Sequence, residues 1–190
     1  MITITNLTKK FGKKTVFKNF SVTLPSNGLI ALSGESGAGK TTLLRMIAGL
    51  DTKYSGKIDL GQHTGISYAF QESRLLNTST VLENVSLPLG NTKEAKEIAA
   101  FCLSELGLGN ELRSYPEELS GGMKQRVSIA RALAFDGDVI LLDEPFNGID
   151  ENRVDDIIKL IKRLSKTRLF IIVSHNAEHI EKLGCKILKI

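Results

Sequence analysis

Hydrophobic and polar residues alternate at the start of the chain, over residues 2–5 (Ile-Thr-Ile-Thr). This alternation predicts a β-strand with one buried face, and a second strand-like run covers residues 16–24. Residues 29–32 (Leu-Ile-Ala-Leu) are wholly apolar, as in a strand buried on both faces, and apolar residues recur with helical spacing over residues 42–50. The pattern therefore predicts a strand, a glycine-containing loop and a helix in this order.

The middle of the chain changes from strand to helix character. Two short strands are predicted over residues 57–60 and 65–70, separated by a polar turn that contains glycine. Apolar residues then recur with a helical period over residues 92–106, which predicts a helical lobe. The residues expected on the buried face of this helix are Ala95, Ile98, Ala99, Cys102 and Leu106.

Strands and helices alternate in the last third of the chain. A helix is predicted over residues 121–135, and apolar strands are predicted over residues 139–142 and 169–173. Apolar strands that alternate with helices indicate a parallel sheet covered on both faces, so we expect an α/β fold. The helix between the two strands is expected to bury Val154, Ile157, Ile158, Ile161 and Leu164.

The composition is that of a single globular domain. The chain has 190 residues, of which 42% are hydrophobic and 24% are charged, and these values exclude disordered and fibrous classes. The formal net charge is +4, but the lysines are scattered, Trp is absent and only three Tyr occur. A nucleic-acid-binding surface is not expected, because neither a basic stripe nor a base-stacking platform is evident.

Two cysteines, Cys102 and Cys185, lie far apart and lack the close spacing of a metal or redox site. We expect them to be buried free thiols in a reducing compartment. No apolar run approaches the ~20 residues that cross a bilayer, and the first residues do not resemble a secretion signal. If the protein acts at a membrane, we expect another chain to span it.

Residues 34–41 (Gly-Glu-Ser-Gly-Ala-Gly-Lys-Thr) match the pattern of a phosphate-binding loop (P-loop) between a strand and a helix. Glycines let backbone N–H groups close around phosphate oxygens, and the helix that follows adds its positive end. Lys40 is expected to reach the β and γ phosphates of ATP, and Thr41 to offer its hydroxyl to Mg²⁺. The alternative is a flexible turn that contains a lysine. The residues expected to bind the nucleotide are Gly34, Glu35, Ser36, Gly37, Ala38, Gly39, Lys40, Thr41 and Thr42.

Two adjacent carboxylates, Asp143 and Glu144, end the apolar strand predicted over residues 139–142. Neighbouring side chains of a strand point in different directions, so the two acids can do different work. Asp143 suits the Mg²⁺ shell, and Glu144 suits the polarisation of an attacking water, which makes it the predicted catalytic base. Without the upstream loop, a solvated strand end with two acids would be the simpler interpretation.

Residues 119–126 (Leu-Ser-Gly-Gly-Met-Lys-Gln-Arg) predict a helix entry in which Ser120 acts as the N-cap. The whole string also resembles the signature motif of the ATP-binding cassette (ABC) family. The other motifs of the chain follow the same order as in ABC nucleotide-binding domains, so the resemblance covers nearly the whole chain. In that family the signature of one subunit and the P-loop of its partner enclose one ATP, so the resemblance implies a second copy of this chain. The signature residues that would act on the partner's ATP are Leu119, Ser120, Gly121, Gly122 and Met123.

The resemblance implies a single ABC domain over residues 1–190, with the P-loop NTPase fold. Residues 1–70 would form a small antiparallel β lobe and the P-loop part of a mainly parallel core. Residues 71–125 would form an α-helical lobe that carries the signature, and residues 126–190 would complete the core.

Further residues receive roles only through this resemblance. Gln71 matches the glutamine that senses Mg²⁺ and water, and His175 matches the switch histidine that contacts the γ phosphate. Asp150 matches the aspartate of the D-loop, which communicates across the dimer, and Phe11 matches the aromatic that stacks on adenine. Outside this context Gln71 would be an exposed loop residue, His175 a packed histidine, Asp150 a helix N-cap and Phe11 a core residue. The resemblance implies ATP and Mg²⁺ as cofactors, with the metal held by Thr41, Gln71 and Asp143.

A narrower resemblance concerns the particular residues within and around the motifs. Residues 70–76, 83–85, 123–127 and 143–146 are similar to the nitrate, sulfonate and taurine branch of bacterial importers. This implies an ATPase subunit on the cytoplasmic face of the membrane, together with integral membrane permease subunits and an extracytoplasmic substrate-binding protein. The alternatives are an exporter, a lipoprotein-handling complex, a cassette that binds ATP only for regulation, and a non-transport ABC ATPase that acts on nucleic acid or the ribosome.

Overall fold

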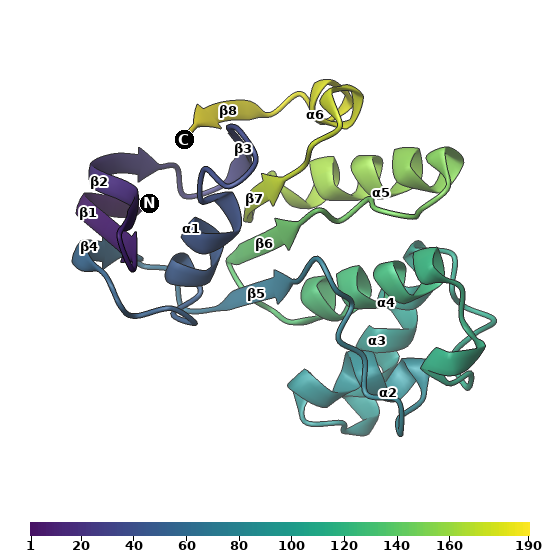
Figure 1. The fold of residues 1–190 in the computed structure, drawn as a ribbon. Coiled ribbons are helices and arrows are strands. Elements are labelled where there is room, and N and C mark those ends of the chain that lie inside the picture. Colours follow the sequence, from purple (N-terminus) through teal and green to yellow (C-terminus); the bar gives the residue numbers. More distant parts are fainter.

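Two β-sheets and six α-helices make up the computed structural model, which describes residues 1–190 (Figure 1). The smaller sheet is antiparallel, with strand order β2-β1-β4. It carries the N-terminal residues whose alternation predicted strands, because Ile2, Ile4 and Leu7 are buried while their neighbours face outward. Its strands are β1 (Ile2–Phe11), β2 (Lys14–Leu24) and β4 (Ser55–Asp59).

The larger sheet contains five parallel strands in the order β5-β6-β7-β3-β8. All residues of the two central strands β6 and β7 are buried, which explains their unbroken apolar sequences. The predicted α/β fold with a parallel core and a small antiparallel lobe is therefore confirmed. The five strands are β3 (Gly28–Ser33), β5 (Ile66–Ala69), β6 (Val139–Asp143), β7 (Leu169–Val173) and β8 (Lys186–Lys189).

The core is divided into two apolar clusters, one on each face of the parallel sheet. Val139 and Leu141 belong to the cluster that includes helix α1 (Lys40–Ile47) and the antiparallel sheet. Ile140 and Leu142 belong to the other cluster, which includes helix α5 (Glu151–Leu164). Alternate residues of this apolar strand therefore pack into the clusters on opposite faces of the sheet. Figure 1 shows α5 beside α6 (Ala177–Leu183), with α1 between the two sheets.

A group of helices lies to one side of the parallel sheet, at the lower right of Figure 1. It contains α2 (Val81–Ser86), α3 (Lys93–Glu105) and α4 (Gly121–Ala134), together with the 3₁₀ turns Leu87–Leu89 and Pro116–Glu118. Helix α4 packs against α2, α3 and β5, so it connects this helical lobe to the sheet. The expected division after residue 125 falls inside α4.

Some expectations about individual side chains were wrong. Ile98 is 48% exposed, because the buried stripe of α3 runs through Ala95, Ala99 and Leu103 at steps of four residues. Leu50 is exposed because α1 ends three residues before it, at Ile47.

Other side chains are less buried than expected. Leu164, at the end of α5, is only partly buried. Cys102 and Cys185 are free thiols, as expected, but each is partly rather than fully buried. Burial raises the pKa of both thiols. None of the helices combines the length and the apolar character needed to cross a membrane.

Candidate nucleotide-binding site

The phosphate-binding loop lies between the end of β3 at Ser33 and the start of α1 at Lys40. Gly39 has a φ of 108°, and a Cβ placed on it would lie 2.4 Å from the Cγ1 of Val16. A Cβ on Gly34 would lie 2.8 Å from the carbonyl oxygen of Ile190. Glycine is therefore required at both positions, once for the backbone conformation and in both cases for the close approach of neighbouring segments.

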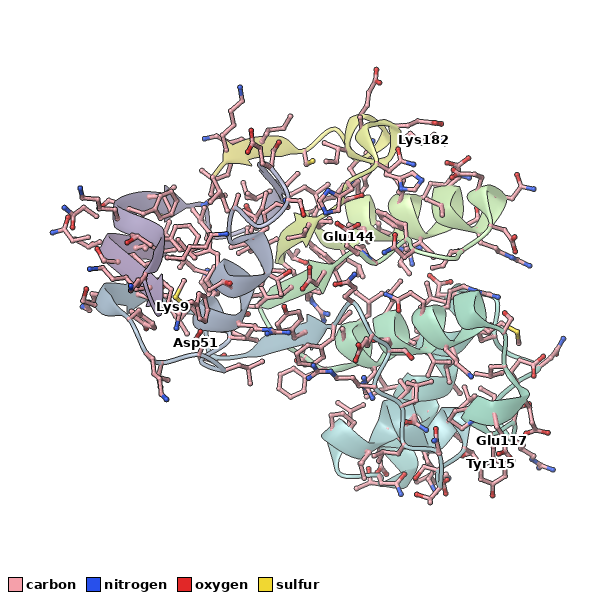
Figure 2. The ribbon with its side chains drawn as sticks, viewed as in Figure 1. Lys9, Asp51, Tyr115, Glu117, Glu144 and Lys182 are labelled. Carbon is pink, nitrogen blue, oxygen red and sulfur yellow. The ribbon has the colours of Figure 1, made fainter.

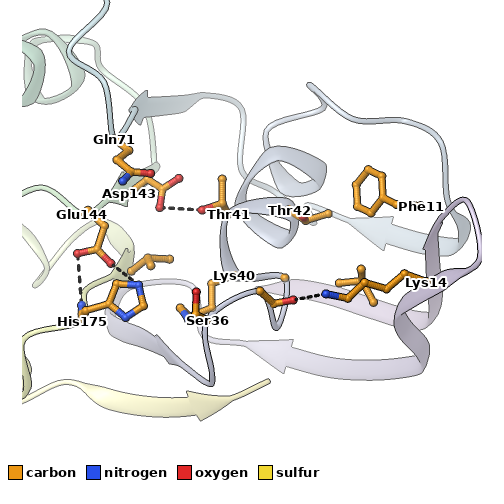
Figure 3. Close-up of a pocket in the computed structure, with 14 residues that line it drawn as sticks. Phe11, Lys14, Ser36, Lys40, Thr41, Thr42, Gln71, Asp143, Glu144 and His175 are labelled. Atoms are coloured by element: carbon orange, nitrogen blue, oxygen red, sulfur yellow. Dashed lines mark hydrogen bonds and ion pairs between the residues drawn. The ribbon is translucent and has the colours of Figure 1, made fainter.

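A cavity of about 410 Å³ opens above this loop (Figure 3). Its wall is formed by the β1–β2 hairpin, the P-loop, the first turn of α1, and the segments that follow β5, β6 and β7. The carboxyl ends of adjacent parallel strands meet here, where ligands bind in open α/β sheets. The structure places these predicted residues around it: Phe11, Ser36, Gly37, Gly39, Lys40, Thr41, Thr42, Gln71, Asp143, Glu144 and His175.

Three predicted loop residues do not line the cavity, namely Gly34, Glu35 and Ala38. The first two contribute through their backbone, because Lys40 Nζ donates to the carbonyl oxygens of Gly34 at 2.8 Å and Glu35 at 3.0 Å. The Lys40 side chain is buried, so its ammonium is held inside the loop at the N-terminus of α1. A positive charge beside free helical N–H groups makes this end of the cavity suited to phosphate.

Asp143 uses its two carboxylate oxygens for different partners. The hydroxyl of Thr41 donates to Oδ1 at 3.1 Å, and the hydroxyl of Tyr68 donates to Oδ2 at 3.1 Å. Burial and the Asp143 charge raise the pKa of the Tyr68 hydroxyl, so Tyr68 acts as a neutral donor. Sequence patterns did not identify Tyr68, because its contact with Asp143 depends on β5 pairing with β6.

The donor set beside Asp143 fits Mg²⁺. A carboxylate, the Thr41 hydroxyl and the amide of Gln71 all face the cavity (Figure 3), and these are the hard oxygen ligands that Mg²⁺ selects. Mg²⁺ characteristically takes only one or two such protein ligands and completes its shell with phosphate oxygens and water. Thr41, Gln71 and Asp143 are the residues that could hold the ion.

Glu144 is 7% exposed and lies directly after the end of β6. Its φ of 50° is unusual for a residue with a side chain, and its backbone N–H donates to the Val173 carbonyl at 2.9 Å. The Glu144 carboxylate faces His175, whose backbone N–H donates to Oε2 at 3.3 Å and whose Nε2 lies 3.3 Å from Oε1 (Figure 3). Burial raises the pKa of Glu144, while His175 partly opposes this effect. A buried carboxylate with a raised pKa, beside an exposed imidazole, is suited to proton transfer.

Three further residues line the cavity that sequence patterns did not single out: Lys14, Val16 and Val173. Lys14 Nζ donates to the Gly37 carbonyl at 3.5 Å, which places a second ammonium group at the P-loop (Figure 3). Its only sequence signal is its position in the hairpin close to Phe11. Its contact with the P-loop depends on the packing of the hairpin against that loop, which a local pattern does not predict.

The signature segment lies outside this cavity. Ser120 caps α4 by accepting a hydrogen bond from the Met123 backbone N–H at 3.2 Å, and Leu119 is buried in the core. A second cavity, of about 390 Å³, is lined by residues 120–123, Arg126 and residues 148–150. Gly122 is packed closely there, because an added Cβ would lie 2.3 Å from the Gly148 carbonyl oxygen.

Asp150 holds the N-cap position of α5, but its side chain makes no capping hydrogen bond. The sequence left two roles open for Asp150, the N-cap of a helix and the D-loop aspartate. The N-cap role is limited to the position of its backbone, because the side chain caps no N–H group. Asp150 lines the cavity of about 390 Å³ that contains residues 120–123, which is called the signature cavity below.

The sequence is similar to several curated proteins. The family model described as ABC transporter matches residues 17–147. Aliphatic sulfonates import ATP-binding protein SsuB of Burkholderia ambifaria is 37% identical over 195 residues, covering 100% of this chain and 60% of that protein. Phosphonates import ATP-binding protein PhnC of Fusobacterium nucleatum is 34% identical, covering 99% of this chain and 87% of that protein. The chain thus spans 60% of the length of the Burkholderia sulfonate-import proteins that it matches.

The fold is similar to that of a solved dimeric ATP-binding cassette in a post-hydrolysis state, bound to ADP and Pi. The TM-score is 0.90 at 29% identity, and the match covers 100% of this chain and 94% of that chain. The family match covers more than half of the chain, and the relatives above exceed 30% identity over nearly all of it. The chain therefore belongs to the ABC transporter family of ATP-binding cassettes.

Proposed function

We propose that this chain binds ATP with Mg²⁺ in the cavity above the P-loop and hydrolyses it, as the ATP-binding subunit of an importer. One observation carries the proposal. Around a single cavity, a buried ammonium at Lys40, the Thr41–Asp143 pair and the Glu144–His175 pair face one another. Phosphate binding, metal binding and water activation need these three groups, each in a different place.

Phosphate binding is assigned to the loop and to α1. Lys40 Nζ, now held by two loop carbonyl oxygens, would turn toward the β and γ phosphate oxygens, which are stronger acceptors. Backbone N–H groups at the start of α1 would bind the same phosphates. When bound, Mg²⁺ would neutralise charge on the phosphate oxygens during transfer. Phe11, exposed at the opposite end of the cavity, would stack on the adenine.

Water activation is assigned to Glu144. Its carboxylate would accept a proton from the water whose oxygen attacks the γ phosphorus, while the bond to the β–γ bridging oxygen breaks. The raised pKa makes Glu144 a better proton acceptor than an exposed glutamate, provided that it is ionised. His175 would stabilise that carboxylate and contact the γ phosphate, and Gln71 would position the water and the metal.

A second copy of the chain is part of the proposal. The residues of the signature line a cavity separate from the nucleotide cavity, so within one chain they do not face the phosphates. In the dimeric state named for the solved relatives, the signature of one copy would close on the P-loop of the other. Ser120 and Gly122 would then contact the γ phosphate from the N-terminus of α4.

The transported substrate is proposed from the relatives. SsuB and PhnC are named for the import of aliphatic sulfonates and phosphonates, which are small organic anions. We infer that this chain drives a permease for an anion of this kind, from the cytoplasmic face of the membrane. Separate permease subunits and an extracytoplasmic substrate-binding protein would select the anion.

The test is ATP hydrolysis by the purified chain and by three variants. Lys40→Ala should lose nucleotide binding, and Glu144→Gln should bind ATP but hydrolyse it at least about a hundredfold more slowly, as expected for loss of a general base. Glu97→Gln, which removes an exposed carboxylate on α3, is the matched control and should behave as the unaltered chain. Undiminished hydrolysis by Glu144→Gln would show that the assigned base is wrong.

A further inference from the structure

A buried lysine lies against the aromatic ring that ends β1. Lys9 is only 3% exposed, and its Nζ lies 4.6 Å from the centroid of the Phe11 ring. The same Nζ donates to Asp51 Oδ1 at 2.6 Å and to the Lys53 carbonyl at 2.9 Å. Figure 2 labels Lys9 and Asp51 close to each other, where the antiparallel sheet meets the end of α1. Neither residue belongs to the nucleotide cavity, and neither has received a role from the motifs.

This ammonium is fully committed to its partners. A lysine this deeply buried is stable only when its charge is paired and its N–H groups are bonded. Here a carboxylate, a carbonyl and an aromatic face meet the three N–H groups, and Lys9 lowers the pKa of Asp51. The geometry of Lys9 is therefore fixed by Asp51, and Lys9 in turn fixes one face of Phe11.

The ion pair joins two parts of the fold that contribute different parts of the wall of the nucleotide cavity. Lys9 and Phe11 belong to β1 of the antiparallel sheet, whereas Asp51 follows α1, the helix that begins with Lys40. Phe11 is 52% exposed and lines the cavity, while Lys9 does not line it. The ammonium thus covers one face of the ring and leaves the other available for a flat ligand.

We propose that Lys9, held by Asp51, is a positioning residue that presents Phe11 as the platform for the nucleotide base at a fixed distance from the P-loop. The proposal rests on the function proposed above, in which Phe11 stacks on adenine, and adds the residues that hold the ring in place. Asp51 and Lys9 thereby join Phe11 in a three-residue unit, Asp51–Lys9–Phe11, which the phosphate site does not need.

The phosphate site is anchored independently of this unit. Leu43, Leu44, Met46 and Ile47 fix α1 in the core, and all four are essentially inaccessible to solvent. Loss of the ion pair should therefore release Phe11 while the P-loop and Lys40 keep their positions. Ligands that contain the base and ligands that contain only phosphates should respond differently.

The experiment compares the binding of ATP and of inorganic tripolyphosphate, each with Mg²⁺, by isothermal titration of the whole chain. Lys9→Met keeps an unbranched apolar side chain and removes the ammonium. We expect it to weaken ATP binding about fivefold, the size of one cation–π contact, and to leave tripolyphosphate binding unchanged. Asp51→Asn should act in the same direction. Tripolyphosphate binding also reports that each variant is folded around its P-loop.

A double-mutant cycle isolates the role of the ring. In the Phe11→Ala background, Lys9→Met should have no further effect on ATP binding, because the platform that it positions is gone. Lys57→Met is the matched control, since the Lys57–Asp59 ion pair is exposed and lies on neighbouring strand β4.

The outcomes separate this inference from the function on which it rests. Equal losses for ATP and tripolyphosphate, or no loss for either, would overturn the positioning role while the unaltered chain still binds ATP. An effect of Lys9→Met that persists in the Phe11→Ala background would overturn it as well. An unaltered chain that binds neither ligand would overturn the proposed function and this inference together.

Discussion

The two oxygens of Asp143 show how single residues prepare the metal site. Tyr68 holds Oδ2, which orients the carboxylate so that Oδ1 faces Thr41 and the cavity. A hydrogen bond to a charged group contributes about 1.5–3 kcal/mol when it is formed away from solvent. Tyr68 is thus a residue that supports a ligand without binding the metal itself.

Removal of the Tyr68 hydroxyl should weaken metal binding. We expect Tyr68→Phe to lower the affinity of the ATP-bound chain for Mn²⁺, used as a spectroscopic substitute for Mg²⁺, by roughly tenfold. Electron paramagnetic resonance of free Mn²⁺ measures this directly. Tyr54→Phe is the control, because no side-chain hydrogen bond is formed by Tyr54. Equal Mn²⁺ affinity in the unaltered chain and Tyr68→Phe would disprove the supporting role.

The buried carboxylate of Glu144 links activity to stability through its raised pKa. Its pKa in the folded chain lies above that in the unfolded chain, so the unfolded chain gives up this proton more readily as pH rises. The ionised Glu144 therefore lowers the free energy of unfolding at neutral pH, and this destabilisation disappears at acidic pH, where the carboxyl is protonated. We expect Glu144→Gln to raise the melting temperature at neutral pH, and this gain to shrink as the pH falls. Melting curves across this pH range, with Glu97→Gln as the control, test the sign.

The same shift governs hydrolysis. Glu144 accepts a proton only when ionised, so turnover should fall as the pH decreases through the raised pKa of the carboxyl. This decline should begin at a higher pH than for an ordinary glutamate. Stability and activity thus favour opposite protonation states of one side chain.

At the scale of the elements, the short distance between the P-loop and the β1–β2 hairpin accounts for one glycine. Gly39 and Gly28 have almost the same φ, 108° and 111°, but only Gly39 has neighbours within 4 Å of an added Cβ. Gly39→Ala should therefore cost about 1–3 kcal/mol more stability than Gly28→Ala, since both are strained and only the first also clashes with Val16. Urea unfolding of the two variants gives the difference directly. Equal losses of stability in the two variants would mean that the hairpin moves away from the added methyl group without a cost in free energy.

The elements were predictable where their pattern is local. The apolar runs of β3, β6 and β7 and the glycine loop before α1 determine the strand–loop–helix order without long-range information. The phase of α3 was not predictable to the residue, because Ile98 and Leu103 fit a helical stripe equally well until the positions of α2 and α4 are known. Tyr68 and Lys14 could not be found at all, since strand pairing and hairpin docking bring them to the site.

At the scale of the whole molecule, the nucleotide cavity and the signature cavity lie at separate places on one chain. The nucleotide cavity holds Lys40 and Glu144, and the signature cavity holds Ser120 and Gly122. If each ATP lies between the P-loop of one copy and the signature of another, a dimer contains two such sites. In such a dimer, a chain with a defective P-loop and a chain with a defective signature would together form one intact site.

Mixing experiments should reveal that arrangement. Ser120→Asp keeps an oxygen that can cap α4 but places a negative charge beside the partner's phosphates, so the variant alone should be inactive, as should Lys40→Ala. In a mixed dimer of these two variants, one site combines an intact loop with an intact signature, and hydrolysis should partly return. A chain carrying both substitutions, mixed with the unaltered chain, forms mixed dimers in which neither site is intact. A mixture of the two single variants should therefore be more active than either variant alone. A mixture of the doubly substituted chain with the unaltered chain should be less active than the unaltered chain diluted to the same concentration. Activities that merely add would show that each chain hydrolyses ATP alone.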